Sequence, residues 1–281
     1  MGGPAATTTI LILMPLALFA VLLAGVHADR RAPARVTLAI WIVLPLALLP
    51  WFVEVARQFH WTWFLWAKTY SVVAACAWIA VLRTRRPPVG RAMVLPLYVF
   101  LLINIAEAVA LDMSRGHPAN ALVGGALIVT ASRRLHVDGG PPHDVRFDLG
   151  ASWVIAYSVW NWVFVAANYG PVLAIQHVAV LAAPLFFAGR DGWDLWLQAR
   201  SITLGLYLLL YDATFAASRA LTNAVVWPVW NSPSFVVALQ AVSALVMGAH
   251  LWRRARRARA ERGATAVPRV GSLSSRVEPA E

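Results

Sequence analysis

The stretch that decides the fold is TILILMPLALFAVLLAGV, residues 9–26, followed at once by HADRRAPAR, residues 27–35. The first run carries no charged side chain, and a helix of about 20 apolar residues, or somewhat fewer with flanking groups that reach the interface, crosses a bilayer. The arginines that follow it are typical of a short cytoplasmic loop. Together the two runs predict a membrane-spanning helix whose C-terminal end faces the cytoplasm.

A cleaved signal peptide is the alternative interpretation of the same run, because Val26, His27 and Ala28 resemble a small-residue cleavage site. Signal peptides begin with positive charge. Here no positive charge precedes the apolar residues, and three arginines follow them closely. This order of charges favours an uncleaved first helix with its N-terminus outside.

The composition of the whole chain agrees with a membrane protein. Of its 281 residues, 60% are hydrophobic and 13% are charged, which is too apolar for one soluble core to hide. The apolar runs are continuous rather than alternating, which indicates helices rather than a barrel. The net charge of +11 comes from arginines between the runs and at the end of the chain, so we expect membrane lipids as partners and no nucleic acid. Cys76 is the only cysteine, which excludes an intramolecular disulfide.

The number of spanning helices follows from the apolar runs and from the basic loops. Eight runs approach the required length: 9–26, 36–53, 62–82, 93–113, 151–168, 171–188, 194–211 and 233–252. A ninth, residues 119–132, is short and either spans or enters the membrane and returns. Four basic segments, at residues 30–35, 83–91, 133–146 and 253–262, lie on one side only if this ninth run crosses and residues 213–231 do not. We therefore predict an all-α, polytopic transmembrane helical bundle of about nine spanning helices, with the N-terminus outside and the C-terminus cytoplasmic.

The two ends of this bundle differ in their predicted surroundings. Residues 1–252 are expected to form the transmembrane helical domain, and residues 253–281 a basic, disordered cytoplasmic tail. Residues 213–231 are expected to lie along the outer interface or to re-enter the membrane. The location predicted from these features is the plasma or inner membrane of the cell.

Polar side chains inside the apolar runs indicate a functional site, because each buried charge costs at least ~2.5 kcal/mol on insertion. In the predicted topology Lys68, Glu107, Asn161 and His177 lie about six or seven residues from the outer ends of four helices, roughly 9 to 10 Å along the axis. Glu107 and His177 are the candidate catalytic acid and base. Lys68 and Asn161 are candidate substrate-binding groups.

Further polar residues belong to the same layer at helical spacing. The additional substrate-binding candidates are Asn104, Tyr157, Asn168, Tyr207, Tyr211 and Asp212. Arg200 lies deeper, and we expect it to line the same space from below. The whole set predicts the rim and floor of an outward-facing pocket.

Each of these residues also has other interpretations, some structural and some functional. Glu107 can pair with Lys68 across helices, and Lys68 can extend to the headgroups or, in principle, carry a Schiff base. His177 can bond to Asn161 or Tyr157, or can serve as a metal ligand or proton carrier. The asparagines commonly join helices. No motif of recognised metal-binding or cofactor-binding spacing is present, so the sequence predicts no metal site and leaves the cofactor open.

Three segments carry a resemblance to a known family: NIAEA at residues 104–108, YSVWNWVFVAAN at residues 157–168 and LLLYD at residues 208–212. They look similar to a group of bacterial polytopic membrane proteins that forms a domain-of-unknown-function family. The resemblance would cover most of the hydrophobic chain. It implies no activity, ligand or catalytic residue, so function has to be argued from the residues themselves.

Three functions are compatible with a polar layer near one interface. An enzyme for a lipid or lipid-linked substrate would use Glu107 and His177 as acid and base, with Asn161 and Tyr157 orienting the substrate. A transporter or channel for a small polar solute or ion would use the same cavity. A structural or regulatory membrane protein would have no cavity. A cavity closed below and open sideways to lipid favours the enzyme, whereas a continuous path past Arg200 favours transport.

Overall fold

The computed structural model of this chain describes residues 4–60, 63–85, 89–225 and 227–265. Within these ranges the chain forms ten α-helices, two short 3₁₀ helices and one β-hairpin. The elements in chain order are α1 (Pro4–Arg31), α2 (Ala34–Phe59), α3 (Trp63–Arg83), α4 (Arg91–Ser114), α5 (Pro118–Thr130), β1 (Leu135–Val137), β2 (Val145–Phe147), α6 (Ala151–Tyr169), α7 (Pro171–Asp191), η1 (Trp193–Leu195), α8 (Trp196–Ala213), α9 (Phe215–Ala224), η2 (Pro228–Asn231) and α10 (Pro233–Thr265).

The predicted all-α class is confirmed, since every apolar run of the sequence coincides with one of the helices α1 to α8 or with α10. In the described ranges, six helices are long and apolar enough to cross a membrane: α1, α2, α3, α4, α7 and α10. Helix α8 reaches that standard only together with α9, from which it is bent by 81°. Helix α5 has 13 residues and a length of about 20 Å, against a hydrocarbon layer of about 30 Å. Length and composition thus support six or seven spans and do not confirm nine.

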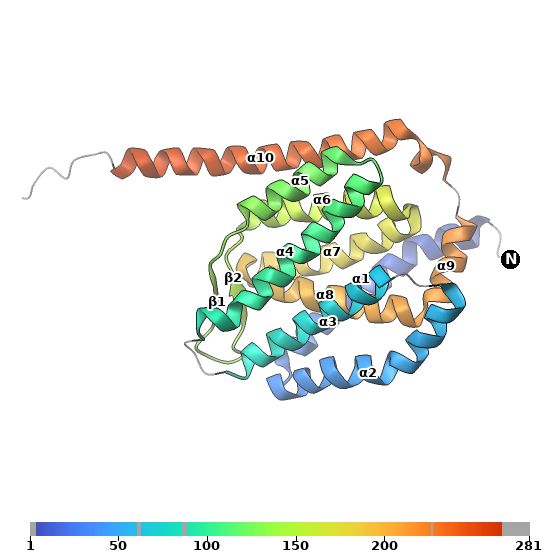
Figure 1. Cartoon of the computed structure of the whole chain (residues 1–281), viewed down its shortest axis with the longest axis horizontal. Coiled ribbons are helices and arrows are strands. Elements are labelled where there is room, and N and C mark those ends of the chain that lie inside the picture. The colour runs from blue at the N-terminus through green and yellow to red at the C-terminus, as the bar shows by residue number, and fades with distance from the viewer. Residues whose placement is uncertain (1–3, 61–62, 86–88, 226, 266–281) are drawn as a thin grey trace, which may run out of the picture.

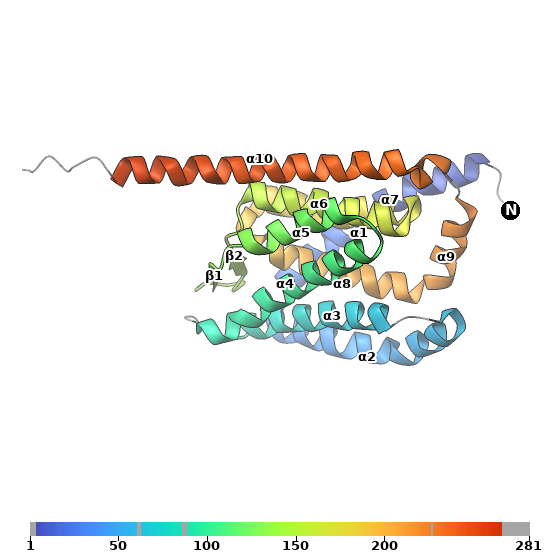
Figure 2. The ribbon, with the colours of Figure 1, turned by 45° about the horizontal axis from the view of Figure 1, so that its top comes forward.

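The helices pack in layers around a central group (Figure 1). Helices α7 and α8 contact each other, α1 packs against both, and α3 and α2 pack against α8. Helix α10 packs against α6 and α5. Figure 2 shows α10 along one edge of the bundle and α2 and α3 along the opposite edge, with α6, α7 and α8 between them. The central helices are therefore shielded on several sides by other helices.

A tight turn between α6 and α7 brings polar residues of the two helices together. Gly170 has a φ of +82°, which side chains rarely tolerate, and Pro171 begins α7, a position that suits proline. The helices run antiparallel from this turn, so residues at similar distances from it face each other. Asn161 precedes Gly170 by nine residues and His177 follows it by seven, and this places them at one level.

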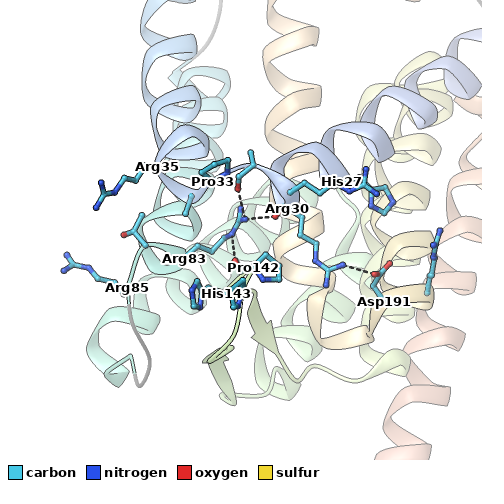
Figure 3. Close-up of a pocket in the computed structure, with 15 residues that line it drawn as sticks. His27, Arg30, Pro33, Arg35, Arg83, Arg85, Pro142, His143 and Asp191 are labelled. Atoms are coloured by element: carbon cyan, nitrogen blue, oxygen red, sulfur yellow. Dashed lines mark hydrogen bonds and ion pairs between the residues drawn. The ribbon is translucent and has the colours of Figure 1, made fainter.

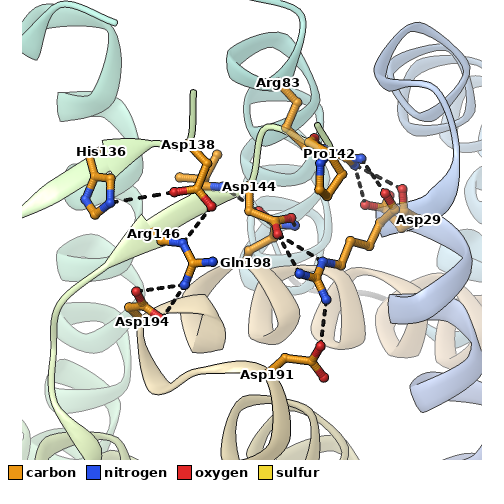
Figure 4. Close-up of polar contacts among 12 residues, drawn as sticks. Asp29, Arg83, His136, Asp138, Pro142, Asp144, Arg146, Asp191, Asp194 and Gln198 are labelled. Atoms are coloured by element: carbon orange, nitrogen blue, oxygen red, sulfur yellow. Dashed lines mark hydrogen bonds and ion pairs between the residues drawn. The ribbon is translucent and has the colours of Figure 1, made fainter. Parts of the chain in front are cut away.

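The β-hairpin is fixed among the helix ends by ion pairs (Figure 4). Arg30 of α1 donates to Asp144 at 2.9 Å and to Asp191 at 2.8 Å. Gln198 of α8 also donates to Asp144, at 3.0 Å. Strands β1 and β2 pair in antiparallel register. The bonds to Asp144 attach the hairpin to α1 and α8, and Arg30 connects it through Asp191 to α7.

Arg146 of β2 makes a second attachment of the hairpin (Figure 4). Its Nε donates to Asp138 at 2.7 Å, and its Nη1 donates to Asp194 of η1 at 2.9 Å. The hydrogen bond to Asp138 raises the pKa of the Arg146 guanidinium, because it favours the charged form. The loop between α5 and α6 is therefore an ordered part of the structure.

Arg83 at the end of α3 holds the link between α1 and α2. Its Nη1 donates to the Asp29 carboxylate at 3.1 Å, and its Nη2 donates to the carbonyl oxygens of Arg30 at 2.8 Å and Ala32 at 3.3 Å. Its Nε donates to the carbonyl oxygen of Pro142 at 3.3 Å. Because the Arg83 side chain is only 1% exposed, these bonds join three segments through one buried group.

The basic end of the chain corrects one expectation. A disordered tail was expected from residue 253, but α10 continues as a helix to Thr265, while residues 266–281 lie outside the described residues. Nη1 of Arg254 donates to the carbonyl oxygen of Thr130 at 2.7 Å, so the start of the basic segment is attached to the end of α5. With the contacts of Arg30 and Arg83, this brings the four basic segments to one end of the molecule.

Candidate functional site

A cavity of about 600 Å³ lies among α3, α4, α6, α7 and α8, and we call it the central cavity. Its lining residues on α8 are Arg200, Leu204, Leu208 and Tyr211, among others, and their spacing puts them on one helix face. From Arg200 to Tyr211 the helix rises about 16 Å. The central cavity is thus an elongated space parallel to the helices, and its volume is typical of a small-molecule site.

The floor of the central cavity is built by Asn161, His177 and Arg200. Asn161 Oδ1 accepts a hydrogen bond from His177 Nε2 at 2.8 Å and another from Arg200 Nη2 at 3.2 Å. An amide oxygen only accepts, so Nε2 of His177 carries the proton and Nδ1 is left as a proton acceptor. The interhelical bond that the sequence allowed between His177 and Asn161 is present.

Arg200 lacks the partner that a buried guanidinium ordinarily has. Arg200 is only 4% exposed, and its Nε has no hydrogen-bond partner among the described residues. Its Nη1 lies 3.5 Å from the carbonyl oxygen of Val180, at the limit for a hydrogen bond. Within the described ranges no ion pair involves Arg200. A charge buried this way is costly unless something else compensates it.

The far end of the central cavity is also basic. Arg115 donates from Nη1 to the carbonyl oxygen of Asn168 at 2.6 Å, and its guanidinium carbon lies 5.8 Å from the centre of the Tyr169 ring. Arg219 of α9 lies 6.0 Å from the centre of the Phe59 ring. These two arginines rest on aromatic faces, a favourable arrangement for cations.

The side chains that line the central cavity therefore carry a net positive charge. Lys68, Arg115, Arg200 and Arg219 line it, and its described lining contains no Asp or Glu. Glu107 neutralises one of these cations, since its Oε2 lies 3.3 Å from Lys68 Nζ. The remaining arginines have no carboxylate on the wall.

Between the basic ends the walls of the central cavity are apolar. The apolar lining residues are Leu65, Ala108, Leu111, Phe164, Val165, Leu173, Leu204 and Leu208. A charged floor, apolar walls and a basic mouth match a molecule that has both a charged and an apolar part. This match between the cavity and an amphipathic molecule holds whichever end of the protein faces the cytoplasm.

Six of the residues singled out from the sequence line the central cavity: Lys68, Asn104, Asn161, His177, Tyr207 and Tyr211. Arg200 lines it too, as expected. Tyr207 donates from its hydroxyl to Gln176 Oε1 at 2.9 Å, so part of its polar capacity is already used. Glu107 is not among the lining residues and instead forms the ion pair with Lys68 that the sequence allowed.

Three other predicted site residues have structural partners. Tyr157 lies in an aromatic group below the floor, with its ring centre 5.5 Å from that of Trp153 and 4.9 Å from that of Trp196. Asn168 donates from Nδ2 to Asp112 at 2.7 Å, which fits the helix-joining interpretation. Asp212 accepts a hydrogen bond from the Thr69 hydroxyl at 2.7 Å and is fully buried.

Sequence reasoning missed Arg115 and Arg219. Both lie outside the runs that were searched for buried charges, so depth within a helix did not identify them. Their position was nevertheless informative, because they belong to the side that the predicted topology places outside, where arginine is uncommon. A search for such exceptional arginines would have found the mouth of the cavity.

In the part of the chain that is described, the central cavity narrows beside Arg200. A void of about 50 Å³ lies beside Arg200 and shares Asn104, Arg200 and Leu204 with the cavity. Beneath it Trp153, Tyr157 and Trp196 pack together. The pocket at the arginine-rich end shares no lining residue with either space.

Metal ligands do not gather in the described residues, since no three His, Cys, Asp or Glu side chains lie close enough to hold one ion. His143 Nδ1 instead lies 3.2 Å from the carbonyl oxygen of Asp138 within the hairpin.

The fold defines a helical protein with several apolar helices of membrane-spanning length and a basic, partly apolar cavity among them. Residues 5–141, from α1 to the hairpin, match a family described as a family of unknown function (DUF5692). The resemblance expected from the sequence is confirmed over these residues, which include segment 104–108 but not segments 157–168 or 208–212. Neither curated proteins nor solved structures give a match to this chain.

Proposed function

We propose that this protein is a multi-pass protein of the plasma or inner membrane that binds an amphipathic anion in the central cavity. The ligand is a lipid or lipid-linked molecule with a phosphate or carboxylate head. The observation that carries the proposal is Arg200, a buried arginine on the cavity floor without a carboxylate partner in the described chain. Arginine binds phosphate and carboxylate groups through paired hydrogen bonds, and the leucine and phenylalanine side chains above it suit an apolar chain.

We further propose that the protein acts on this ligand as an enzyme, with His177 as the group that transfers a proton. Two observations support this: the Nδ1 of His177 is left as an acceptor by the bond from Nε2 to Asn161, and the rings of Trp153, Tyr157 and Trp196 pack together near the Arg200 end of the cavity. In this proposal Asn161 positions His177, and Glu107 positions Lys68. A transporter remains the second candidate, and it requires a continuous path past Arg200.

Replacing His177 by glutamine tests the enzymatic part. Liposomes of a bacterial lipid extract containing the wild-type protein are expected to change in composition with time, as measured by lipid mass spectrometry. The variant is expected to slow this change by about 10²- to 10⁴-fold, as is usual when a general base is lost, while still binding lysophosphatidic acid. Composition equal to that of protein-free liposomes would exclude the enzyme, and an unchanged rate in the variant would exclude His177.

The orientation in the membrane is also a proposal, with about nine crossings, the N-terminus outside and residues 253–281 in the cytoplasm. Two features support it. The four basic segments meet at one end of the bundle through the contacts of Arg30, Arg83 and Arg254. Helix α9 bends away from α8 by 81° at the opposite end (Figure 1), as expected of an element that lies along the interface.

Cysteine labelling measures this orientation directly, because Cys76 is the only native cysteine and is 1% exposed. We expect Ala220→Cys in α9 to react with a membrane-impermeant maleimide on intact cells. Gly139→Cys at the tip of the hairpin is expected to react only after permeabilisation. The reverse pattern would show that the arginine-rich end faces outward.

A further inference from the structure

A second, larger space lies at the arginine-rich end of the bundle (Figure 3). It has a volume of about 900 Å³, and we call it the arginine pocket. Its walls come from the end of α1, the link to α2, the end of α3, the tip of the hairpin and the end of α7. Segments that are far apart in the sequence therefore meet around it.

The lining of the arginine pocket is strongly basic. Six arginines line it: Arg30, Arg31, Arg35, Arg83, Arg85 and Arg190. His27 and His143 also contribute to the wall, whereas Asp191 is the one carboxylate in the described lining. Such a concentration of one sign of charge in a concave space attracts counter-ions.

Two of the six arginines are occupied by structural bonds. Arg83 binds the carboxylate of Asp29 and four carbonyl oxygens, and Arg30 binds Asp144 and Asp191. The other four have exposed side chains, and no ion pair joins them to another described residue. The carboxylates near the pocket are thus already bound by the two structural arginines, and four guanidinium groups are left for a ligand.

The same structural bonds hold the pocket in shape. Arg83 ties the link between α1 and α2 to the hairpin at Pro142, and Arg30 ties α1 to α7 through Asp191. Figure 3 shows Arg35 and Arg85 at the same edge of the pocket, with Arg83 and Pro142 between them and Asp191. Because the walls are fixed before binding, a ligand would not have to order them, which favours affinity.

We propose that the arginine pocket binds a phosphate-bearing anion, either a soluble phosphate compound or the headgroup of an anionic lipid. Guanidinium groups match phosphate oxygens in pairs, and several arginines from different segments can reach one such group. The volume falls in the range of small-molecule sites. This site is separate from the central cavity and does not depend on the function proposed for it.

The experiment compares two double variants of the full chain in two binding measurements, of which the first, with pyrophosphate, is made by calorimetry. In Arg35→Gln with Arg85→Gln the edge of the pocket is neutralised. In the control, Arg133→Gln with Arg134→Gln, two exposed arginines of the same basic end but outside the pocket are neutralised. One arm titrates inorganic pyrophosphate into protein in phosphatidylcholine nanodiscs, and the other measures the enrichment of phosphatidic acid around protein extracted from mixed bilayers.

We expect the pocket variant to bind at least one probe about tenfold more weakly than the wild type, since paired guanidinium contacts to phosphate are lost. The control variant is expected to bind as the wild type does. Loss of pyrophosphate binding assigns the site to a soluble anion, and loss of phosphatidic acid enrichment alone assigns it to a lipid headgroup. The proposal is overturned if the wild type binds neither probe, or if the two double variants lose binding equally.

Discussion

Replacing Arg200 by glutamine is expected to raise the unfolding temperature of the ligand-free protein and to remove its stabilisation by lysophosphatidic acid. The variant loses a buried charge that has no carboxylate partner in the described chain, and burying such an ion costs several kcal/mol. After allowance for the lost bonds to Asn161 and Val180, the expected gain in stability is on the order of 1–3 kcal/mol. Thermal unfolding in detergent micelles measures both effects.

The matched controls for this prediction are a ligand and a variant. Monoacylglycerol has the apolar chain of lysophosphatidic acid without its phosphate, so it should stabilise the wild type much less. Arg133→Gln removes an exposed arginine from the other end of the molecule and should leave both measurements unchanged. A lower unfolding temperature for the Arg200 variant, together with an undiminished response to lysophosphatidic acid, would show that Arg200 supports the fold and binds nothing.

Replacing Arg83 by methionine is expected to have the largest effect of opposite sign. The substitution leaves Asp29 buried without its cation, and its side chain is 9% exposed; breaking a buried ion pair by removing one partner costs about 3–5 kcal/mol. The bonds to four carbonyl oxygens disappear as well. Thermal unfolding in the same micelles should show the loss.

Removing the orphaned charge distinguishes this ion pair from simple packing. The double variant Arg83→Met with Asp29→Asn should regain a large part of the stability, because the two effects are coupled through one contact. Arg133→Met, on the exposed surface of the same end, is the control and should unfold as the wild type does. Equal unfolding temperatures for the single and double variants would mean that the pair with Asp29 contributes nothing.

The fold was predictable in its elements because each apolar run has one stable form in a bilayer. Every predicted run is a helix, and the reason lies in the backbone, whose polar groups have no partner in lipid except each other. The bend between α8 and α9 and the ordered hairpin were not predictable to the same degree. They depend on contacts between distant segments, such as Arg30 with Asp144, which periodicity does not reveal.

The sequence predicted how deep each site residue lies along its helix, but only partly which way its side chain points around the helix axis. The position of a residue along a helix fixes its depth, and this correctly grouped Lys68, Asn161 and His177 around the central cavity. The direction of a side chain around the helix axis depends on packing, so the sequence did not separate Asn161 from Asn168, which binds Asp112 instead. Glu107 pairs with Lys68, which is the structural interpretation that the sequence allowed, and it does not line the central cavity.

The account of function depends on whether the Arg200 guanidinium binds the head of an amphipathic anion. Native mass spectrometry of protein released from bilayers that contain lysophosphatidic acid and monoacylglycerol measures this most directly. We predict that the wild type and Arg133→Gln each carry one more bound lysophosphatidic acid than Arg200→Gln does, with no monoacylglycerol on any of them. Retention of lysophosphatidic acid by Arg200→Gln at the wild-type level would contradict the account.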